Sequence, residues 1–135
     1  MKYMLDTDTC IYLIKKKPLS VITRLQKMNL SALCVSSITL SELEYGVEKS
    51  ERRDQNKAAL AEFIAPIEVK GYDDLAAAQY GKIRSSLEKK GQLLGSLDML
   101  IAAHAVALNR TLVTNNVKEF HRVQELKVEN WVLLT

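Results

Sequence analysis

Two aspartates, Asp6 and Asp8, interrupt an apolar run near the start of the chain, in "KYMLDTDTCIYLI". Two further acids border apolar stretches, because Glu42 follows "ALCVSS" and Asp98 opens "LDMLIAAHAVALN". Two carboxylates about 4 Å apart repel by roughly 4 kcal/mol at an effective dielectric of about 20. A cluster of three or four must therefore take up protons or a cation. If these acids meet in the fold, they predict a site that holds protons or a metal ion.

The residue types predict which metal such a site would hold. An all-oxygen ligand set with few histidines favours Mg²⁺ or Mn²⁺ over Zn²⁺. His104 stands six residues after Asp98, about 600° around a helix, and so points away from the Asp98 face. His121 lies in a short polar segment, and both histidines are interpreted as structural or solvated. No serine or cysteine has a clear base beside it, so nucleophile chemistry on those residues is not indicated.

Strands and helices are expected to alternate along the chain, which is typical of a parallel sheet. The predicted strands cover residues 2–5, 32–37, 67–70, 111–114 and 126–134. The predicted helices cover about 9–16, 18–28, 39–50, 52–65, 73–90 and 97–109, with a helical turn at 116–120. The pattern predicts an α/β fold, a three-layer α/β/α sandwich with a central, mostly parallel sheet, in one domain over residues 1–135.

Three details of the helices are predicted as well. Gly46 is expected to weaken or end the helix over residues 39–50, and Gly91 to end the helix over residues 73–90. The second of these helices is expected to place four residues in the core, namely Leu75, Ala78, Ile83 and Leu87.

The acids fall near the ends of the predicted strands. Asp6 ends the first strand, and in open α/β sheets ligands bind at that edge. Glu42 and Asp98 are placed in the first turns of their helices, while Asn115 and Asn116 follow the fourth strand. If the strands are parallel, all these side chains leave from one edge and could converge.

Each acid also has an ordinary structural explanation. Asp8 could cap the first helix, and Thr39 to Glu42 spells the T-x-x-E pattern of a capping box. Asp98 in a first turn gains roughly 0.3–1 kcal/mol from the helix dipole. A non-enzymatic α/β binding module, whose acids only cap helices, therefore remains an alternative. Three acids at equivalent topological positions favour a functional site instead.

Composition sets the broad class and the compartment. The chain is 47% hydrophobic and 26% charged, with a net charge of +3, which permits a nucleic-acid partner without requiring one. Cys10 and Cys34 stand in apolar runs and are interpreted as buried thiols in a reducing cytoplasm. The early aspartates interrupt any signal-peptide core. The longest apolar stretch, residues 93–108, contains Asp98 and His104, so no membrane span is expected.

The opening motif allows two family interpretations. "DTD" after an apolar strand resembles the start of the haloacid-dehalogenase phosphatases, in which the first Asp, here Asp6, would be the nucleophile. Cys10 departs from that signature at its fifth position, and "TLVTNN" offers asparagines where that family has a late acidic pair.

The second interpretation covers nearly all of the chain. "YMLDTDTCIYLI", "VSSITLSELEYG", "GSLDMLIAAHAVALNRTLVTNNVKEF" and Trp131 resemble the PIN-domain ribonucleases, and most closely the VapC toxins of bacterial toxin–antitoxin pairs. This resemblance implies that Asp6, Glu42 and Asp98 bind Mg²⁺ or Mn²⁺, with Thr7 and Ser37 at small hydroxyl positions nearby. It implies hydrolysis of RNA phosphodiesters by metal-activated water, leaving a 5′ phosphate and a 3′ hydroxyl.

The resemblance also implies partners. They are a cognate antitoxin whose tail blocks the active site, a second copy of the chain in a homodimer, and an RNA substrate. Relatives with this "LDTxTCI…SSITLSEL" style resemble enzymes that cut initiator tRNA in its anticodon stem-loop. Basic residues on the rim, for which Lys15, Lys16 and Arg84 are the candidates, would steer the RNA backbone.

Two positions depart from the family pattern. The family usually has Asn where this chain has Asp8, and the extra charge could tighten metal binding or disturb the hydrogen bonding of Asp6. Many relatives place a fourth acid just after the fourth strand, where this chain has Asn116, with Glu119 one turn further on. Either Asn116 contacts a metal-bound water or Glu119 substitutes for the acid, which leaves the number of metals open.

Overall fold

A five-stranded, all-parallel sheet lies at the centre of the protein. The structure is a computed structural model that describes residues 2–132. The strands are ordered β3-β2-β1-β4-β5, with bounds β1 Tyr3–Leu5, β2 Leu33–Ser36, β3 Glu68–Lys70, β4 Thr111–Val113 and β5 Val128–Glu129. Central β1 pairs with β2 and β4, and Leu5 lies opposite Val113. The predicted parallel sheet is confirmed, although the last strand is shorter than expected; Leu133 and Leu134 of its predicted range lie outside the described residues.

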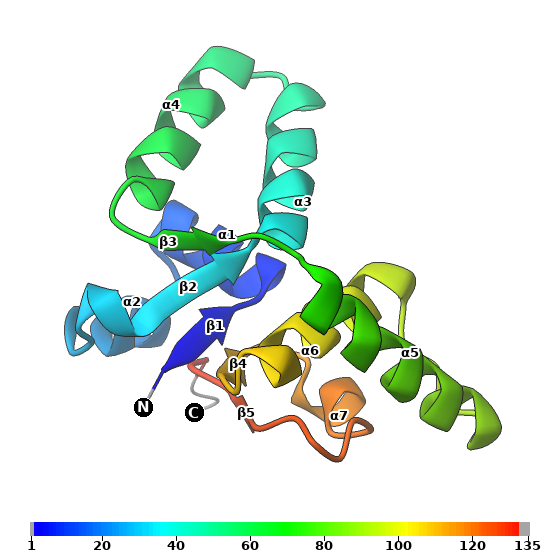
Figure 1. Ribbon diagram of the computed structural model, residues 1–135. Helices are drawn as coiled ribbons and strands as arrows, with labels where there is room; N and C mark the ends of the chain where they lie inside the picture. Colours follow the sequence, from blue (N-terminus) through cyan, green and yellow to red (C-terminus); the bar gives the residue numbers. More distant parts are fainter. Residues whose placement is uncertain (1, 133–135) are drawn as a thin grey trace.

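Helices cover both faces of the sheet, as Figure 1 shows, so the predicted three-layer sandwich is confirmed. Their bounds are α1 Thr7–Lys15, α2 Leu19–Gln26, α3 Ser37–Glu48, α4 Arg53–Ile64, α5 Asp74–Lys89, α6 Ser96–Ala107 and α7 Val117–Phe120, with a short 3₁₀ turn at Leu30–Ala32. Within residues 2–132 no helix is long and apolar enough to cross a membrane.

Successive residues of β1 enter different cores, because side chains of a strand alternate between its faces. Met4 packs with residues of α5, α6 and α7, including Ile83, Ile101 and Phe120. Tyr3 and Leu5 belong to the opposite core, with residues from α1 to α4. The sheet is thus buried on both faces, which explains why its strands are continuous apolar runs.

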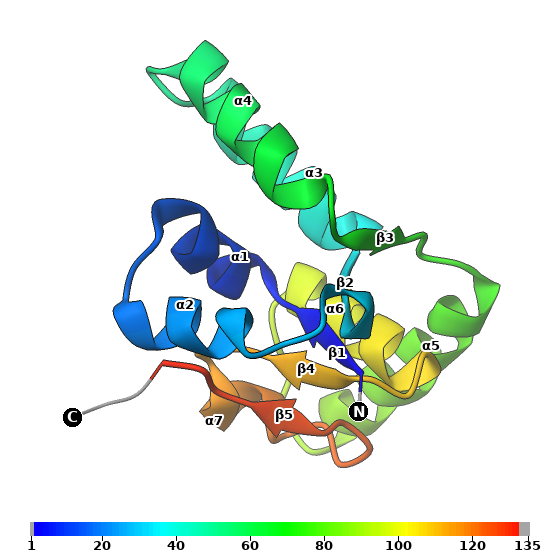
Figure 2. The ribbon, with the colours of Figure 1, turned by 90° about the vertical axis from the view of Figure 1, so that its left-hand side faces the viewer.

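Helices α3 and α4 form a hairpin that projects beyond the sheet, as the two views in Figures 1 and 2 show. Gly46, which is expected to weaken or end this helix, does not end it, because α3 continues through it to Glu48. A glycine inside a helix costs about 1 kcal/mol relative to alanine. Burial of Leu43 and Val47 in the same helix offsets that cost.

Helix α5 buries a different stripe from the one predicted. Ile83 and Leu87 are buried as expected, but Leu75 is 65% exposed and Ala78 is also exposed, so those two assignments are wrong. Ala76 takes the core position, because its i, i+7 and i+11 spacing with Ile83 and Leu87 keeps the three on one face. The predicted stop at Gly91 is confirmed by its φ of 65°, which favours glycine.

Candidate active site

Asp6 connects the central strand to the first helix. Its backbone N–H donates to Val113 at 3.0 Å, and its side chain accepts from the Thr9 N–H at 2.9 Å, which makes it the N-cap of α1. The expectation that Asp8 caps this helix is therefore wrong; Asp8 lies exposed in the first turn. The helix begins two residues earlier than predicted, because Asp6 already has the extended backbone of a cap residue.

Asp6 is almost completely buried, with 6% of its surface exposed. Burial raises the pKa of its carboxyl group, and the negative charge of Asp8 adds to the rise. Hydrogen bonds from Thr114 and Thr9 act in the opposite direction and lower the pKa. A cation beside Asp6 would act with these hydrogen bonds to favour the ionised form.

Glu42 lies on α3 and its side chain extends to the start of α1, next to Asp6. Ser36 caps this helix by accepting from the Ile38 N–H, so the predicted capping box from Thr39 to Glu42 is wrong, and Glu42 lies in the second turn rather than the first. One carboxylate oxygen of Glu42 instead accepts a hydrogen bond from the Thr7 hydroxyl at 2.6 Å. The Thr7 contact ties the acid on α3 to the start of α1.

Asp98 lies in the first turn of α6, as predicted. Helix α6 leads directly into the amino end of β4, so its own first turn lies at the opposite, carboxyl edge of the sheet. Burial raises the pKa of Asp98 to about 6, and the negative charges of Glu42, Asp6, Glu119 and Asp8 contribute to the rise in that order. The structure therefore brings all five acids into one electrostatic neighbourhood at the sheet edge.

The segment after β4 supplies the remaining polar groups. The Asn116 side chain donates a hydrogen bond to the Glu119 carboxylate at 2.8 Å. The negative charge of Glu119 is one of those that raise the pKa of Asp98. Thr114 is fully buried, and its hydroxyl interacts with Asp6 and accepts from the Asn116 N–H at 2.9 Å. Sequence reasoning missed Thr114, although its position at the end of "TLVT" beside the acids was a signal for it.

The donor set fits a hard divalent cation, because every group in it offers oxygen. Within residues 2–132, however, no three acidic, histidine or cysteine side chains form a ready-made metal cage. The acids lie near enough for their charges to raise the pKa of Asp98, but among the described residues they do not form a closed set of ligands. That arrangement suits an ion such as Mg²⁺, which keeps several waters and uses few protein ligands.

The other predicted residues lie in varied settings. The Ser37 hydroxyl accepts from the Tyr72 N–H at 3.0 Å and so holds the loop after β3. Lys15 borders the same groove as Glu42, between α1 and the α3–α4 hairpin. Lys16 borders a second groove nearby.

Arg84, the third residue predicted to contact RNA, is not among the residues that line the grooves bordered by Lys15 and Lys16. It lies on α5 and is engaged with its own helix, donating to the Tyr80 hydroxyl at 2.8 Å and pairing with Glu88 at 3.7 Å. The two cysteines, Cys10 and Cys34, are buried free thiols, as expected.

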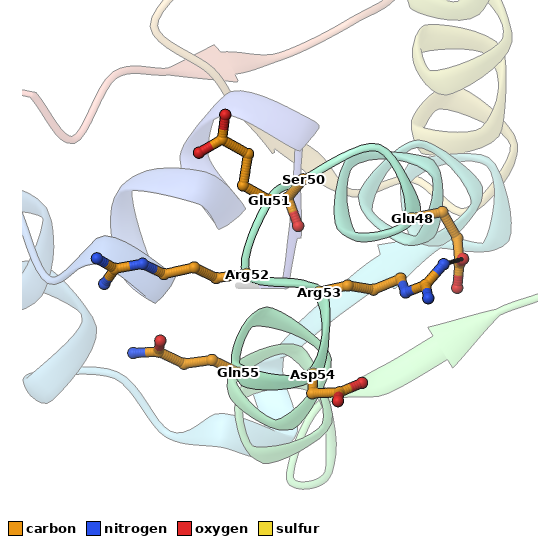
Figure 3. A pocket seen from close by; sticks show the side chains of 7 residues that line it. All are labelled: Glu48, Ser50, Glu51, Arg52, Arg53, Asp54 and Gln55. Carbon is orange, nitrogen blue, oxygen red and sulfur yellow. Dashed lines mark ion pairs between the residues drawn. The ribbon is translucent and has the colours of Figure 1, made fainter.

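A polar depression at the tip of the α3–α4 hairpin is separate from the acidic site. It is lined by Glu48 and residues 50–55, and none of the five acids is among them. Figure 3 shows Arg53 directed toward Glu48, 3.5 Å away, while Arg52 extends from the opposite side. Its lining mixes three acids, Glu48, Glu51 and Asp54, with the two arginines, Arg52 and Arg53.

Comparison with known proteins identifies the family. The model of the PIN domain matches residues 3–126, so the chain belongs to the PIN-domain family. It is 46% identical to Ribonuclease VapC2 of Haemophilus influenzae over 132 residues, covering 98% of this chain and 99% of the relative. It is 45% identical to the tRNA(fMet)-specific endonuclease VapC of Salmonella typhimurium over 131 residues, covering 97% and 98%.

Solved structures agree with this result. The crystal structure of VapBC2 from Rickettsia felis bound to a DNA fragment from their promoter contains a similar chain, with a TM-score of 0.92 and 43% identity. The match covers 98% of this chain and 100% of that one. Within the PIN-domain family the chain thus groups with the VapC ribonucleases, to which it is similar over nearly its whole length, and the phosphatase alternative is not favoured. PIN-domain nucleases generally use divalent metal ions.

Proposed function

We propose that the protein hydrolyses RNA at the acidic site formed by Asp6, Glu42 and Asp98, with Mg²⁺ or Mn²⁺ as the ion. The observation that carries this proposal is the raised pKa of Asp98, which reflects burial and four neighbouring acids. Carboxylates held this close are stabilised by a divalent ion. When bound, such an ion would supply activation of water and neutralisation of charge on the phosphate.

The chain's own groups have distinct parts in this proposal. Asp6, fixed as the cap of α1 and bonded to Thr114, is the most rigidly held acid. Thr7 orients Glu42, and Asn116 orients Glu119 for a second ion. Lys15, beside Glu42, is placed to attract the RNA backbone, while Lys16 and Arg84 are weaker candidates because they lie in other settings.

Initiator tRNA, cut in its anticodon stem-loop, is the proposed substrate. It is supported by the name of the Salmonella relative, which shares 45% identity across nearly the whole chain. The proposed protein partner is the cognate antitoxin. An apolar groove of about 390 Å³ between α1 and the α3–α4 hairpin supports a bound segment there, because Glu42 is one of its lining residues.

A homodimer in the cytoplasm completes the proposal. Leu75 on α5 and Leu97 on α6 are 65% and 46% exposed, which favours an interface that covers them. Light scattering on the purified protein tests the dimer, and a monomer at micromolar concentration would contradict it.

The acids are tested by incubating purified protein with initiator tRNA and, as a control, an elongator tRNA, in Mg²⁺, Mn²⁺ or EDTA. We expect cleavage of the initiator tRNA alone, and none in EDTA. Asp6→Asn, Glu42→Gln and Asp98→Asn should each lower the rate at least 100-fold. Full activity in all three variants would contradict the assigned site, whereas equal cleavage of both tRNAs would contradict only the substrate.

A further inference from the structure

His104 is a buried histidine that contributes no ligand to the acidic site. It lies in the last turn of α6, six residues after Asp98, and 1% of its surface is exposed. Its Nδ1 lies 2.8 Å from the hydroxyl oxygen of Ser36, the residue that caps α3. One side chain thus joins the helix that carries Asp98 to the start of the helix that carries Glu42.

The neighbouring hydrogen bonds indicate whether the Ser36 hydroxyl or the His104 ring is the donor between them. The Ser36 hydroxyl oxygen already accepts from the Ile38 N–H at 3.1 Å, so its own hydrogen is available to donate to His104 Nδ1. The ring hydrogen then lies on Nε2 and accounts for the hydrogen bond to the backbone of Gly71. Burial lowers the pKa of His104, which keeps the ring neutral and Nδ1 able to accept.

The loop after β3 completes the junction. The Tyr72 ring packs edge-on against the His104 ring, with centroids 5.5 Å apart. The backbone N–H of Tyr72 donates to the Ser37 hydroxyl at 3.0 Å. From α6, His104 therefore contacts two segments that are far from it in sequence: the start of α3 and the loop between β3 and α5.

Two pairs of residues relate α3 to α6: Ser36 is hydrogen-bonded to His104, and Glu42 lies near enough to Asp98 for its negative charge to raise the pKa of Asp98. Six residues separate the members on each helix, which is about 9 Å of helix axis at roughly 1.5 Å per residue. Over such a short length a helix is stiff. The distance between Ser36 and His104 therefore constrains the distance between Glu42 and Asp98. Catalytic groups must be held within roughly 0.5 Å of their productive geometry.

We propose that His104 is a positioning residue for the acidic site, which sets the separation of Glu42 and Asp98 by accepting a hydrogen bond from Ser36. This inference rests on the proposed function, because it assumes that these two acids act together on one ion. A purely structural histidine would fill the same space, and its loss would lower stability without a specific effect on the acids.

A matched pair of substitutions separates these two roles. In His104→Asn the side-chain amide lies near the position of Nδ1 and can still accept from Ser36. In His104→Gln it lies near the position of Nε2 and can still donate to Gly71, but the bond to Ser36 is lost. Each variant therefore keeps one of the two hydrogen bonds. Ser36→Ala removes the same bond from the other side.

Three measurements on each variant test the inference: thermal unfolding, Mn²⁺ affinity by electron paramagnetic resonance, and kcat and KM with initiator tRNA. At temperatures where both variants are folded, His104→Gln should weaken Mn²⁺ binding and lower kcat about tenfold or more, with KM changed less than threefold. Losses of 10- to 100-fold are typical when a partner that orients metal ligands is removed. His104→Asn should stay within about threefold of the native protein, and Ser36→Ala should resemble His104→Gln.

Asp98→Asn and Glu42→Gln serve as reference variants. If they lower Mn²⁺ affinity while His104→Asn and His104→Gln behave alike, the positioning role is wrong and the proposed site stands. If the reference variants bind Mn²⁺ as the native protein does, the proposed site itself is wrong. Equal stability of the two His104 variants together with weaker Mn²⁺ binding in His104→Gln would establish the inference, and weaker binding in His104→Asn would overturn it.

Discussion

The Thr7 hydroxyl donates to a carboxylate oxygen of Glu42 at 2.6 Å, across 35 residues of sequence. Thr7 directly follows Asp6, the buried acid that caps α1. The contact therefore holds acids from two different strand ends in a fixed relation. Without this contact the long side chain of Glu42 would have several rotamers available, and restricting it to one of them would cost free energy when the ion binds.

Removing this hydroxyl should therefore reduce activity. In Thr7→Val, Glu42 loses its donor, and we expect the RNA cleavage rate to fall about tenfold, which corresponds to about 1.4 kcal/mol. Thr7→Ser keeps the hydroxyl and is the matched control, with activity within about threefold of the native protein. Single-turnover cleavage of initiator tRNA measures both, and equal rates for the two variants would show that the hydroxyl does not orient Glu42.

Asp98 should destabilise the metal-free protein at neutral pH, because its folded pKa of about 6 lies above the ordinary value of 3.8. Its carboxylate form is disfavoured in the fold, so this group's penalty is absent below the ordinary pKa of 3.8, grows as pH rises from there to about 6, and is fully present above that. Asp98→Asn should therefore raise the free energy of unfolding by about 1 kcal/mol at pH 7.5, after allowance for solvent screening of a half-buried group.

Urea unfolding with EDTA, repeated from pH 7.5 to pH 4, measures this difference. The advantage of the Asp98→Asn variant should shrink as pH falls, because the native carboxyl becomes protonated. A constant difference across this range would mean that the effect comes from packing rather than charge.

Asp8 sets part of the pH dependence of the site, because its charge contributes to the raised pKa of both Asp98 and Asp6. Metal binding requires ionised carboxylates, so Mn²⁺ affinity should rise as pH rises through about 6. In Asp8→Asn the pKa of Asp98 falls, and this rise should move to lower pH. Asp54→Asn, at the tip of the hairpin, is the matched control. Titration calorimetry between pH 5 and pH 8 compares them, and superimposable curves would contradict a role for Asp8.

Thr39 carries an unpaired polar atom in the core of α3. Its side chain is fully buried, and within the described part of the chain its hydroxyl has no hydrogen-bond partner. A buried hydroxyl without a partner costs roughly 1–3 kcal/mol. Thr39→Val keeps the shape and removes the hydroxyl, so it should raise the free energy of unfolding by about 1 kcal/mol. Thr9→Val should instead lower it, because the Thr9 hydroxyl donates to the Val113 carbonyl at 3.1 Å. Urea denaturation of both variants measures these shifts, and a loss of stability in Thr39→Val would reveal an unseen partner.

The parallel sheet and the position of the acids could be predicted because their signals are local. Buried parallel strands are short apolar runs, and Asp6, Glu42 and Asp98 border such runs in sequence. Local patterns were less reliable where more than one register was compatible with the sequence. Asp6 rather than Asp8 caps α1, and Leu75 is exposed while Ala76 is buried. A shift of one or two residues changes little in the sequence pattern, and packing against the sheet decides between the alternatives.

The family, the layered α/β architecture and the acids that border its strands can be read from the sequence alone, since each depends on residues that are neighbours along the chain. Three contacts appear only in the folded molecule: Thr7 donates to Glu42, Thr114 is hydrogen-bonded to Asp6, and His104 is hydrogen-bonded to Ser36. Those pairs join segments separated by 35 to 108 residues. No periodicity or motif encodes such contacts, because they depend on how the helices settle against a shared sheet.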